Sequence, residues 1–187
     1  MLLLTMLTNS SFTQQRIETL YPTDDAFCCD ESLNYNFNLG NLWVGKDSNN
    51  GVFVSLIKFN ISSIPLYATI DAAELQLYAS NDFVVQTGRI LELDPSVSWS
   101  EKTVTYNNMP YGITDNISKV NFSVHEGMHH IDVKKFVNYW HAGNTNNGFQ
   151  IFLEDNDTGH WARFLDKEYS GSYYDPQLIV VYTLPDF

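Results

Sequence analysis

The chain has 187 residues, of which 22 are acidic and 10 are basic, so its formal net charge is −12. A charge of this sign repels nucleic acids, anionic membranes and polyuronates, and it favours a polymer partner that is neutral, cationic or calcium-bridged. Hydrophobic residues make up 44% of the chain. This share, at this length, predicts one folded domain with its own core.

The first seven residues, MLLLTML, are apolar. They lack the basic region and the cleavage site of a signal peptide, and they are too short to span a bilayer. We expect that a leader has been removed from a longer precursor. We divide the chain into an N-terminal arm (residues 1–15) and a single β-sandwich domain (residues 16–187). The arm is expected to add a strand to a neighbouring copy through Leu2, Leu3, Leu4, Met6 and Leu7.

The segment 52–79 contains the two clearest strands. Residues 52–61 are β-rich and carry apolar side chains on both faces, whereas apolar and polar residues alternate along 73–79. That alternation is typical of a half-buried strand. The connection between them holds Pro65 and shows no helical period, so a loop joins the two strands and an antiparallel arrangement is favoured.

Other β-rich segments follow at short intervals, and one segment is helical. Val133, Phe136, Val137 and Trp140 have helical spacing, with Asp132 placed to cap the start and Gly143 to end the helix. The sequence therefore predicts an all-β fold, a two-sheet antiparallel β-sandwich of jelly-roll type with one short amphipathic helix. The remaining expected strands are 16–29 (interrupted at Pro22), a short one around 42–44, 84–93, 117–124, 149–154, 161–166 and 177–183, the last of them buried on both faces.

Cys28 and Cys29 are the only cysteines. A disulfide between adjacent residues is strained, and there is no third cysteine to pair with either. Two interpretations remain open: two small residues at the edge of a strand, or covalent bonding to another subunit.

No catalytic motif is recognisable. The chain lacks a nucleophile turn of the G-x-S-x-G type, the H-E-x-x-H zinc motif and a dinucleotide-binding glycine pattern. His125, His129 and His130 lie close together, but on a strand His129 and His130 would point to opposite faces and could not share one ion. We therefore expect no enzyme activity.

Calcium is the more plausible metal. Acidic and amide side chains gather in three places, at Asp24–Asp25, at Asp47 with Asn49 and Asn50, and at residues 155–157. Such oxygen ligands suit a calcium ion, although the same residues also favour ordinary turns. The candidate ligands of a structural calcium are Asp24, Asp25, Asp155 and Asp157.

Exposed aromatic rings could stack on the apolar faces of sugars. Trp140 is excluded because the helix pattern buries it. Tyr111 lies in a loop and is also an aromatic candidate. The preferred candidates for sugar binding are Trp43, Trp99, Trp161, Tyr173 and Tyr174.

Five N-x-Ser/Thr sequons are present. They are typical of a secreted or cell-surface glycoprotein. The candidate glycosylation sites are Asn9, Asn60, Asn116, Asn121 and Asn156.

Four segments together resemble the DNRLRE-domain family, whose members are also classed among carbohydrate-binding modules. They are LIKFNISSIPLYATIDAAELQLY (56–78), WSEKTVTYNNMP (99–110), IDVKKFVNYWHAGNTNNGFQI (131–151) and FLDKEYSGSYYDPQLIVVYT (164–183). The resemblance covers residues 17–183, and the order and spacing of its segments imply a non-catalytic, extracellular β-sandwich.

The chain departs from that family at four positions. Lys58, Gln76, Lys167 and Asp175 stand where the family commonly has arginine. Members that resemble alginate-binding modules are expected to hold the acidic polymer with basic residues. These differences and the charge of −12 therefore argue against an alginate-type ligand.

Two hypotheses of function follow. The first is a structural subunit of an extracellular filament, sheath or layer, assembled as a homo-polymer by strand addition of the arm. The second is a carbohydrate-binding or adhesive module for a non-acidic polysaccharide. The absence of any attached enzyme domain places the first slightly ahead.

Overall fold

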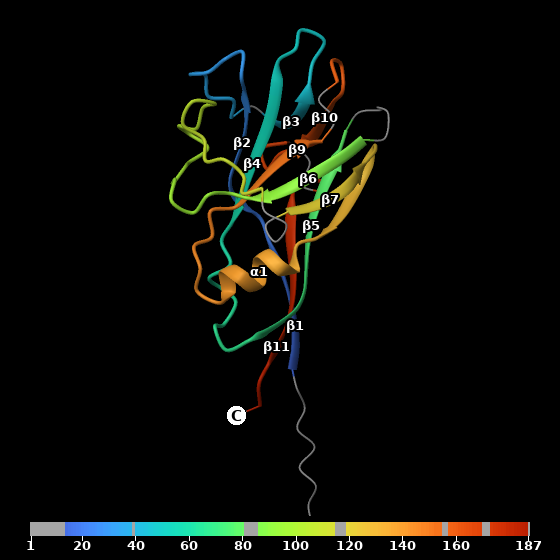
Figure 1. The fold of residues 1–187 in the computed structure, drawn as a ribbon. Coiled ribbons are helices and arrows are strands. Elements are labelled where there is room, and N and C mark those ends of the chain that lie inside the picture. The colour runs from blue at the N-terminus through green and yellow to red at the C-terminus, as the bar shows by residue number, and fades with distance from the viewer. Residues whose placement is uncertain are drawn as a thin grey trace, which may run out of the picture.

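The computed structural model describes residues 14–38, 40–80, 86–114, 119–154, 157–169 and 173–186. Within them, antiparallel strands pair into an 11-stranded sheet with one short helix against it (Figure 1). This confirms the predicted fold class. The elements are β1 (Gln14–Leu20), β2 (Pro22–Cys29), β3 (Asn41–Lys46), β4 (Val52–Phe59), β5 (Thr69–Ala79), β6 (Gln86–Glu92), β7 (Lys119–Val124), β8 (Gly127–Asp132), α1 (Lys134–His141), β9 (Phe149–Leu153), β10 (Trp161–Leu165) and β11 (Gln177–Leu184).

The sheet folds back on itself. Its strand order is β1-β11-β5-β10-β3-β4-β9-β6-β7, with β8 paired to β5 and β2 paired to β4. The joins in the middle are narrow, because β10 meets β5 at one residue pair and β3 meets β4 at two. One hydrogen-bonded sheet thus supplies both layers of the expected sandwich.

The main core lies between the two layers. Leu75 and Leu77 of β5 share one buried cluster with Ile57 of β4 and Ile151 of β9. Helix α1 closes one end of this core, since Phe136, Val137 and Trp140 are buried. The helix and the buried face that its spacing predicted are confirmed.

A second, smaller core explains why β4 is apolar on both faces. Leu56 packs with Cys28 of β2 and with Trp99, Val104 and Met109, which come from the turns between β6 and β7. Residues on the two faces of β4 therefore enter two different clusters. This agrees with the apolar side chains that the sequence places on both faces of the strand.

Three local expectations need correction. In β11 only alternate residues are fully buried, so one face of this strand is half-exposed. Strand β8 was not among the expected strands, because its sequence GMHHID carries a weak apolar pattern. Helix α1 begins at Lys134 without a side-chain bond from its N-cap residue, while Asp132 accepts a hydrogen bond from the Lys134 amide (2.9 Å).

Candidate functional site

Six aromatic rings form a continuous strip across neighbouring strands. Trp161 of β10 packs on Trp43 of β3 with 4.8 Å between ring centroids, and Trp43 lies 5.9 Å from Phe53 of β4. Further contacts carry the strip on into β2 and the loop after it. We call this set the aromatic strip, and its members are Tyr35, Phe37, Phe27, Phe53, Trp43 and Trp161.

The strip is anchored at one point and accessible at the others. Phe27 is buried, whereas Phe37, Phe53, Trp43 and Trp161 are half-buried and Tyr35 is 55% exposed. Half-buried rings are held in place by their neighbours yet keep surface open to solvent. Rigid rings of this kind suit stacking against a ligand because little conformational entropy is lost on binding.

The sheet register explains how residues distant in sequence meet here. Arg163 of β10 pairs with Trp43, and Trp161 pairs with Gly45, which in turn pairs with Phe53 of β4. Gly45 has φ +101°, and a Cβ there would lie 2.3 Å from the His160 carbonyl oxygen. Only glycine allows this close approach, so Gly45 brings Trp161 and Phe53 toward each other.

The structure separates the predicted sugar-binding aromatics into three groups. Trp43 and Trp161 come together in the aromatic strip. Trp99 is only 8% exposed and donates its indole N–H to the Asn147 carbonyl (2.9 Å), which removes it as a platform. Tyr173 and Tyr174 are exposed and form another ring group, in which Tyr174 packs on Tyr78 at 4.2 Å.

Sequence reasoning missed four members of the strip. Tyr35, Phe37, Phe27 and Phe53 were read as parts of strands or loops. The alternation of Tyr35 and Phe37 in a polar segment was the available signal, because rings on one side of a short bridging segment can extend a sheet surface.

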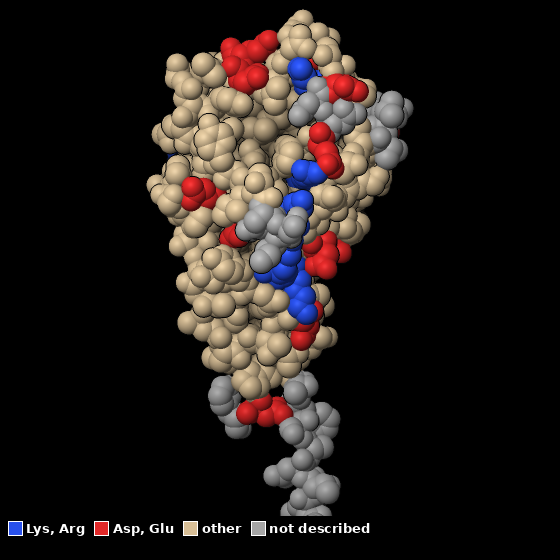
Figure 2. Space-filling model, in the orientation of Figure 1, with Lys and Arg blue, Asp and Glu red and all other residues tan. Residues whose placement is uncertain are grey.

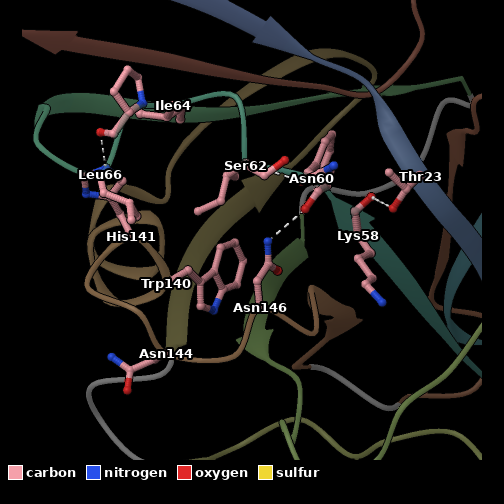
Figure 3. A pocket seen from close by; sticks show the side chains of 13 residues that line it. Thr23, Lys58, Asn60, Ser62, Ile64, Leu66, Trp140, His141, Asn144 and Asn146 are labelled. Carbon is pink, nitrogen blue, oxygen red and sulfur yellow. Dashed lines mark hydrogen bonds between the residues drawn. The ribbon is translucent and has the colours of Figure 1, made fainter.

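At the opposite end of β4 lies a cleft of about 530 Å³. It is bounded by the start of β2, the end of β4, the loop after it, and the C-terminal end of α1 (Figure 3). We call it the end cleft. Its lining residues are Thr23, Lys58, Phe59, Asn60, Ile61, Ser62, Ile64, Pro65, Leu66, Trp140, His141, Asn144 and Asn146.

A partly buried ionic cluster centres on Lys167. Its ammonium contacts Glu101, lies 2.7 Å from Glu168 and 3.4 Å from Asp25. The side chain of Asp25 is fully buried and also accepts the Lys167 backbone N–H (3.0 Å). Lys167 thus joins β2, the turns after β6 and the segment after β10.

The titration of this cluster follows from burial. Desolvation raises the pKa of Asp25 to about 7 against the opposing effect of Lys167, and it raises the pKa of Asp166 to about 6. Desolvation lowers the pKa of Lys167, but hydrogen bonds to Glu101 and Glu168 and the charge of Asp25 outweigh it and raise this pKa above its ordinary value. Lys167 is therefore charged throughout the neutral range.

Among the described residues, the acidic group that could hold a metal contains one predicted calcium ligand, Asp25. Oxygens of Asp25, Asp166 and Glu168 lie within 4.8 Å of one another and could hold a metal ion. Lys167 already places a positive charge against two of these three carboxylates. Asp24 instead accepts the Glu101 backbone N–H at 3.2 Å.

The other acidic loops show ordinary turn chemistry. Asp47 accepts the backbone N–H groups of Asn49 (2.8 Å) and Gly51 (2.9 Å). Asp157 is exposed, and the adjacent Thr158 bonds to Asn50 at 2.7 Å, so two of the predicted acidic clusters meet at one turn. Asp155 lies outside the described residues.

Both cysteines are interior thiols. Cys28 and Cys29 are buried, and burial raises the pKa of Cys28 to about 12. Their burial favours the interpretation as two small residues of a strand, and covalent bonding to another subunit stays a prediction.

The histidine pair behaves as the strand alternation predicts. His129 is buried and its ring stacks on His125 at 4.5 Å, whereas His130 is exposed and lies 2.7 Å from Glu74. Burial lowers the pKa of His129.

Of the five sequons, two lie in the described ranges. Asn60 and Asn121 are both exposed. The asparagines of the other three sequons lie outside the described residues; they are Asn9, Asn116 and Asn156. The arm residues lie outside them as well, namely Leu2, Leu3, Leu4, Met6 and Leu7.

The charged side chains of one face are unevenly placed. Figure 2 shows its basic side chains in one column along the molecule, with acidic side chains beside several of them and a wide, mostly uncharged area to the left. The described part of the chain holds no helix of the length and hydrophobicity that crossing a bilayer requires.

A comparison with protein families bears on the two hypotheses of function. Residues 16–182 match the model of Carbohydrate-binding module family 96. The chain belongs to this family. The match has nearly the boundaries of the predicted resemblance, and it favours the carbohydrate-binding hypothesis over the filament subunit.

As a family 96 module, the chain is classed with binding domains rather than with enzymes. The DNRLRE name itself stays a prediction. A search of curated proteins found no match.

Proposed function

We propose that the chain is a secreted, non-catalytic module that binds a neutral polysaccharide on the aromatic strip. Membership of family 96 supports a carbohydrate ligand. The observation that carries the proposal is the stack of Trp161 on Trp43 at 4.8 Å, extended by Phe53. Successive rings along a surface match the successive apolar faces of a sugar chain.

The shape of the strip favours a polymer over a single sugar. The rings come from four neighbouring strands, β10, β3, β4 and β2, and from the loop after β2, so the strip runs across the sheet. Neighbouring strands are about 4.8 Å apart, so the tryptophans of β10 and β3 together with Phe53 span about the length of two sugar units. Hydroxyl groups that point away from the rings would stay in water, and their desolvation would cost little.

The charge of the molecule favours a neutral ligand. The net charge of −12 repels an acidic chain over a distance of about 10 Å at ordinary ionic strength. Stacking on aromatic rings does not depend on opposite charges, so salt should change the affinity for a neutral ligand little.

We expect retention on neutral polysaccharides and none on alginate. The purified chain would be run by affinity electrophoresis in gels containing xylan, mannan, hydroxyethyl cellulose or alginate, at low and high salt. Retardation by at least one neutral polymer, unchanged by salt, is the expected result. Retardation by alginate alone, lost at high salt, would contradict the proposal.

A further inference from the structure

The end cleft has the properties of a second ligand site. Its volume of about 530 Å³ lies within the range of small-molecule pockets, which is roughly 300 to 1,000 Å³. It is separated from the aromatic strip by most of β4, because Phe53 belongs to the strip and Phe59 lines the cleft. Six residues of extended chain span about 20 Å.

Several polar groups of the cleft are used to shape it. Asn146 donates to the Phe59 carbonyl (2.8 Å) and accepts the Gly148 N–H (3.1 Å). The ring of His141 bonds the Pro65 carbonyl at 2.9 Å, and Thr23 donates to the Lys58 carbonyl at 3.3 Å. These bonds tie α1, β4 and the loop after β4 together, so the cleft is formed before any ligand arrives.

Other polar atoms are left to meet a ligand. Asn60 uses its carbonyl oxygen for the Ser62 N–H (2.9 Å), and Asn144 uses its amide nitrogen for the Tyr139 carbonyl (2.8 Å). Within the described residues, no hydrogen bond involves the Ser62 hydroxyl, the Asn60 amide nitrogen or the Asn144 carbonyl oxygen. Figure 3 shows Asn60 and Ser62 close to each other, with Asn144 apart from them on the other side of Trp140. The cleft thus offers a hydroxyl and a donor on one side and an acceptor on the other.

Apart from Lys58, whose ammonium lies 6.0 Å from the centroid of the Trp99 ring, the rest of the lining is apolar. Phe59 and Ile64 are buried beneath the cleft, and Trp140 is fixed there because its indole N–H donates to Glu92 at 2.8 Å. No carboxylate is among the lining residues, although acidic residues outnumber basic ones about two to one in the chain. A ligand with both hydroxyl groups and apolar C–H faces fits this combination.

We propose that the end cleft is a second saccharide site, which takes one or two neutral sugar units independently of the aromatic strip. The amide and hydroxyl groups of Asn60, Ser62 and Asn144 bind the sugar hydroxyls. The apolar floor covers a C–H face of the ring. The strip holds a polymer chain, whereas the cleft holds a short sugar or a chain end.

The four tryptophans allow a direct test. In a ¹⁵N spectrum their indole signals report the strip (Trp43 and Trp161), the cleft (Trp140) and the second core (Trp99). The unglycosylated chain would be titrated with glucose, galactose, mannose, xylose, N-acetylglucosamine and cellobiose. We expect at least one of these probes to shift the Trp140 signal and leave those of Trp43, Trp161 and Trp99 in place.

Two serines provide matched variants. Ser62→Tyr places a ring in the cleft and should weaken binding of the same probe at least about tenfold, or about 1.4 kcal/mol. Ser63→Tyr adds the same ring at the next residue, which is exposed and does not line the cleft, and it should leave the affinity unchanged. An unmoved Trp140 signal with every probe, or equal affinities of the two variants, would overturn this proposal. Polysaccharide binding on the strip would be unaffected by that outcome.

Discussion

Replacing Lys167 with methionine will destabilise the protein by about 3 kcal/mol at pH 8, because it leaves a buried carboxylate without its cation. Lys167 contacts Asp25, Glu101 and Glu168, and the Asp25 side chain is fully buried. Methionine keeps the length and apolar stem of the side chain. The loss of stability therefore reports the removal of the charge. Urea denaturation would measure it as a change in the free energy of unfolding.

The loss should shrink as the pH falls. The pKa of Asp25 in the folded protein is raised to about 7 from an ordinary value of 3.8. A raised carboxyl pKa contributes stability that is present below pH 4 and lost as the pH rises through 7. Without Lys167 this pKa rises further, so the variant should go on losing stability above pH 7, where the parent no longer does.

The control for this variant is Lys102→Met, which removes an exposed lysine from the turns after β6. It should change the free energy of unfolding by less than about 0.5 kcal/mol at either pH. If the Lys167 variant were as stable as this control at pH 8, the ionic cluster would not hold the three segments together.

The second large effect is expected on binding. Trp161→Ala should weaken the affinity for the retained neutral polysaccharide at least about thirtyfold, equivalent to about 2 kcal/mol, as for other central aromatic residues of binding surfaces. The substitution removes the ring that stacks on Trp43 and leaves β10 in the sheet. Affinity electrophoresis and calorimetry with a soluble hexasaccharide would measure the change.

Tyr139→Ala is the matched control for the strip. Tyr139 is an exposed aromatic residue on α1, at the other end of the molecule (Figure 1). The Tyr139→Ala variant should bind the polysaccharide as tightly as the parent chain does. An equal loss in both variants would show that exposed rings bind without a defined site, and an unchanged affinity in Trp161→Ala would place the polymer elsewhere.

Most of the fold could be predicted because its signals are local. The alternation along β5, the two-sided apolar run of β4 and the helical spacing from Val133 to Trp140 each act within a few residues. Strand β8 was missed because it has a weak apolar pattern and is stabilised by its pairing with β5. The joining of both layers into one sheet depends on long-range pairs such as Phe164 with Ala79, which no local pattern indicates.

The candidate sites were predicted less well for the same reason. Aromatic content pointed to Trp43 and Trp161, but it could not separate them from Trp99, which has the same side chain and lies in a core. The partners of Lys167 come from three segments, with Asp25 at a sequence separation of 142 residues. The lining of the end cleft likewise combines β2, β4, α1 and two loops.

The central claim is that a neutral polysaccharide binds on the aromatic strip. The most direct measurement is a titration of the ¹⁵N-labelled chain with neutral hexasaccharides, in which the four indole signals are followed. We predict that the signals of Trp43 and Trp161 move together with one affinity, while that of Trp99 stays in place. Strip signals that no neutral hexasaccharide moves, while the chain still binds the polymer, would contradict the account.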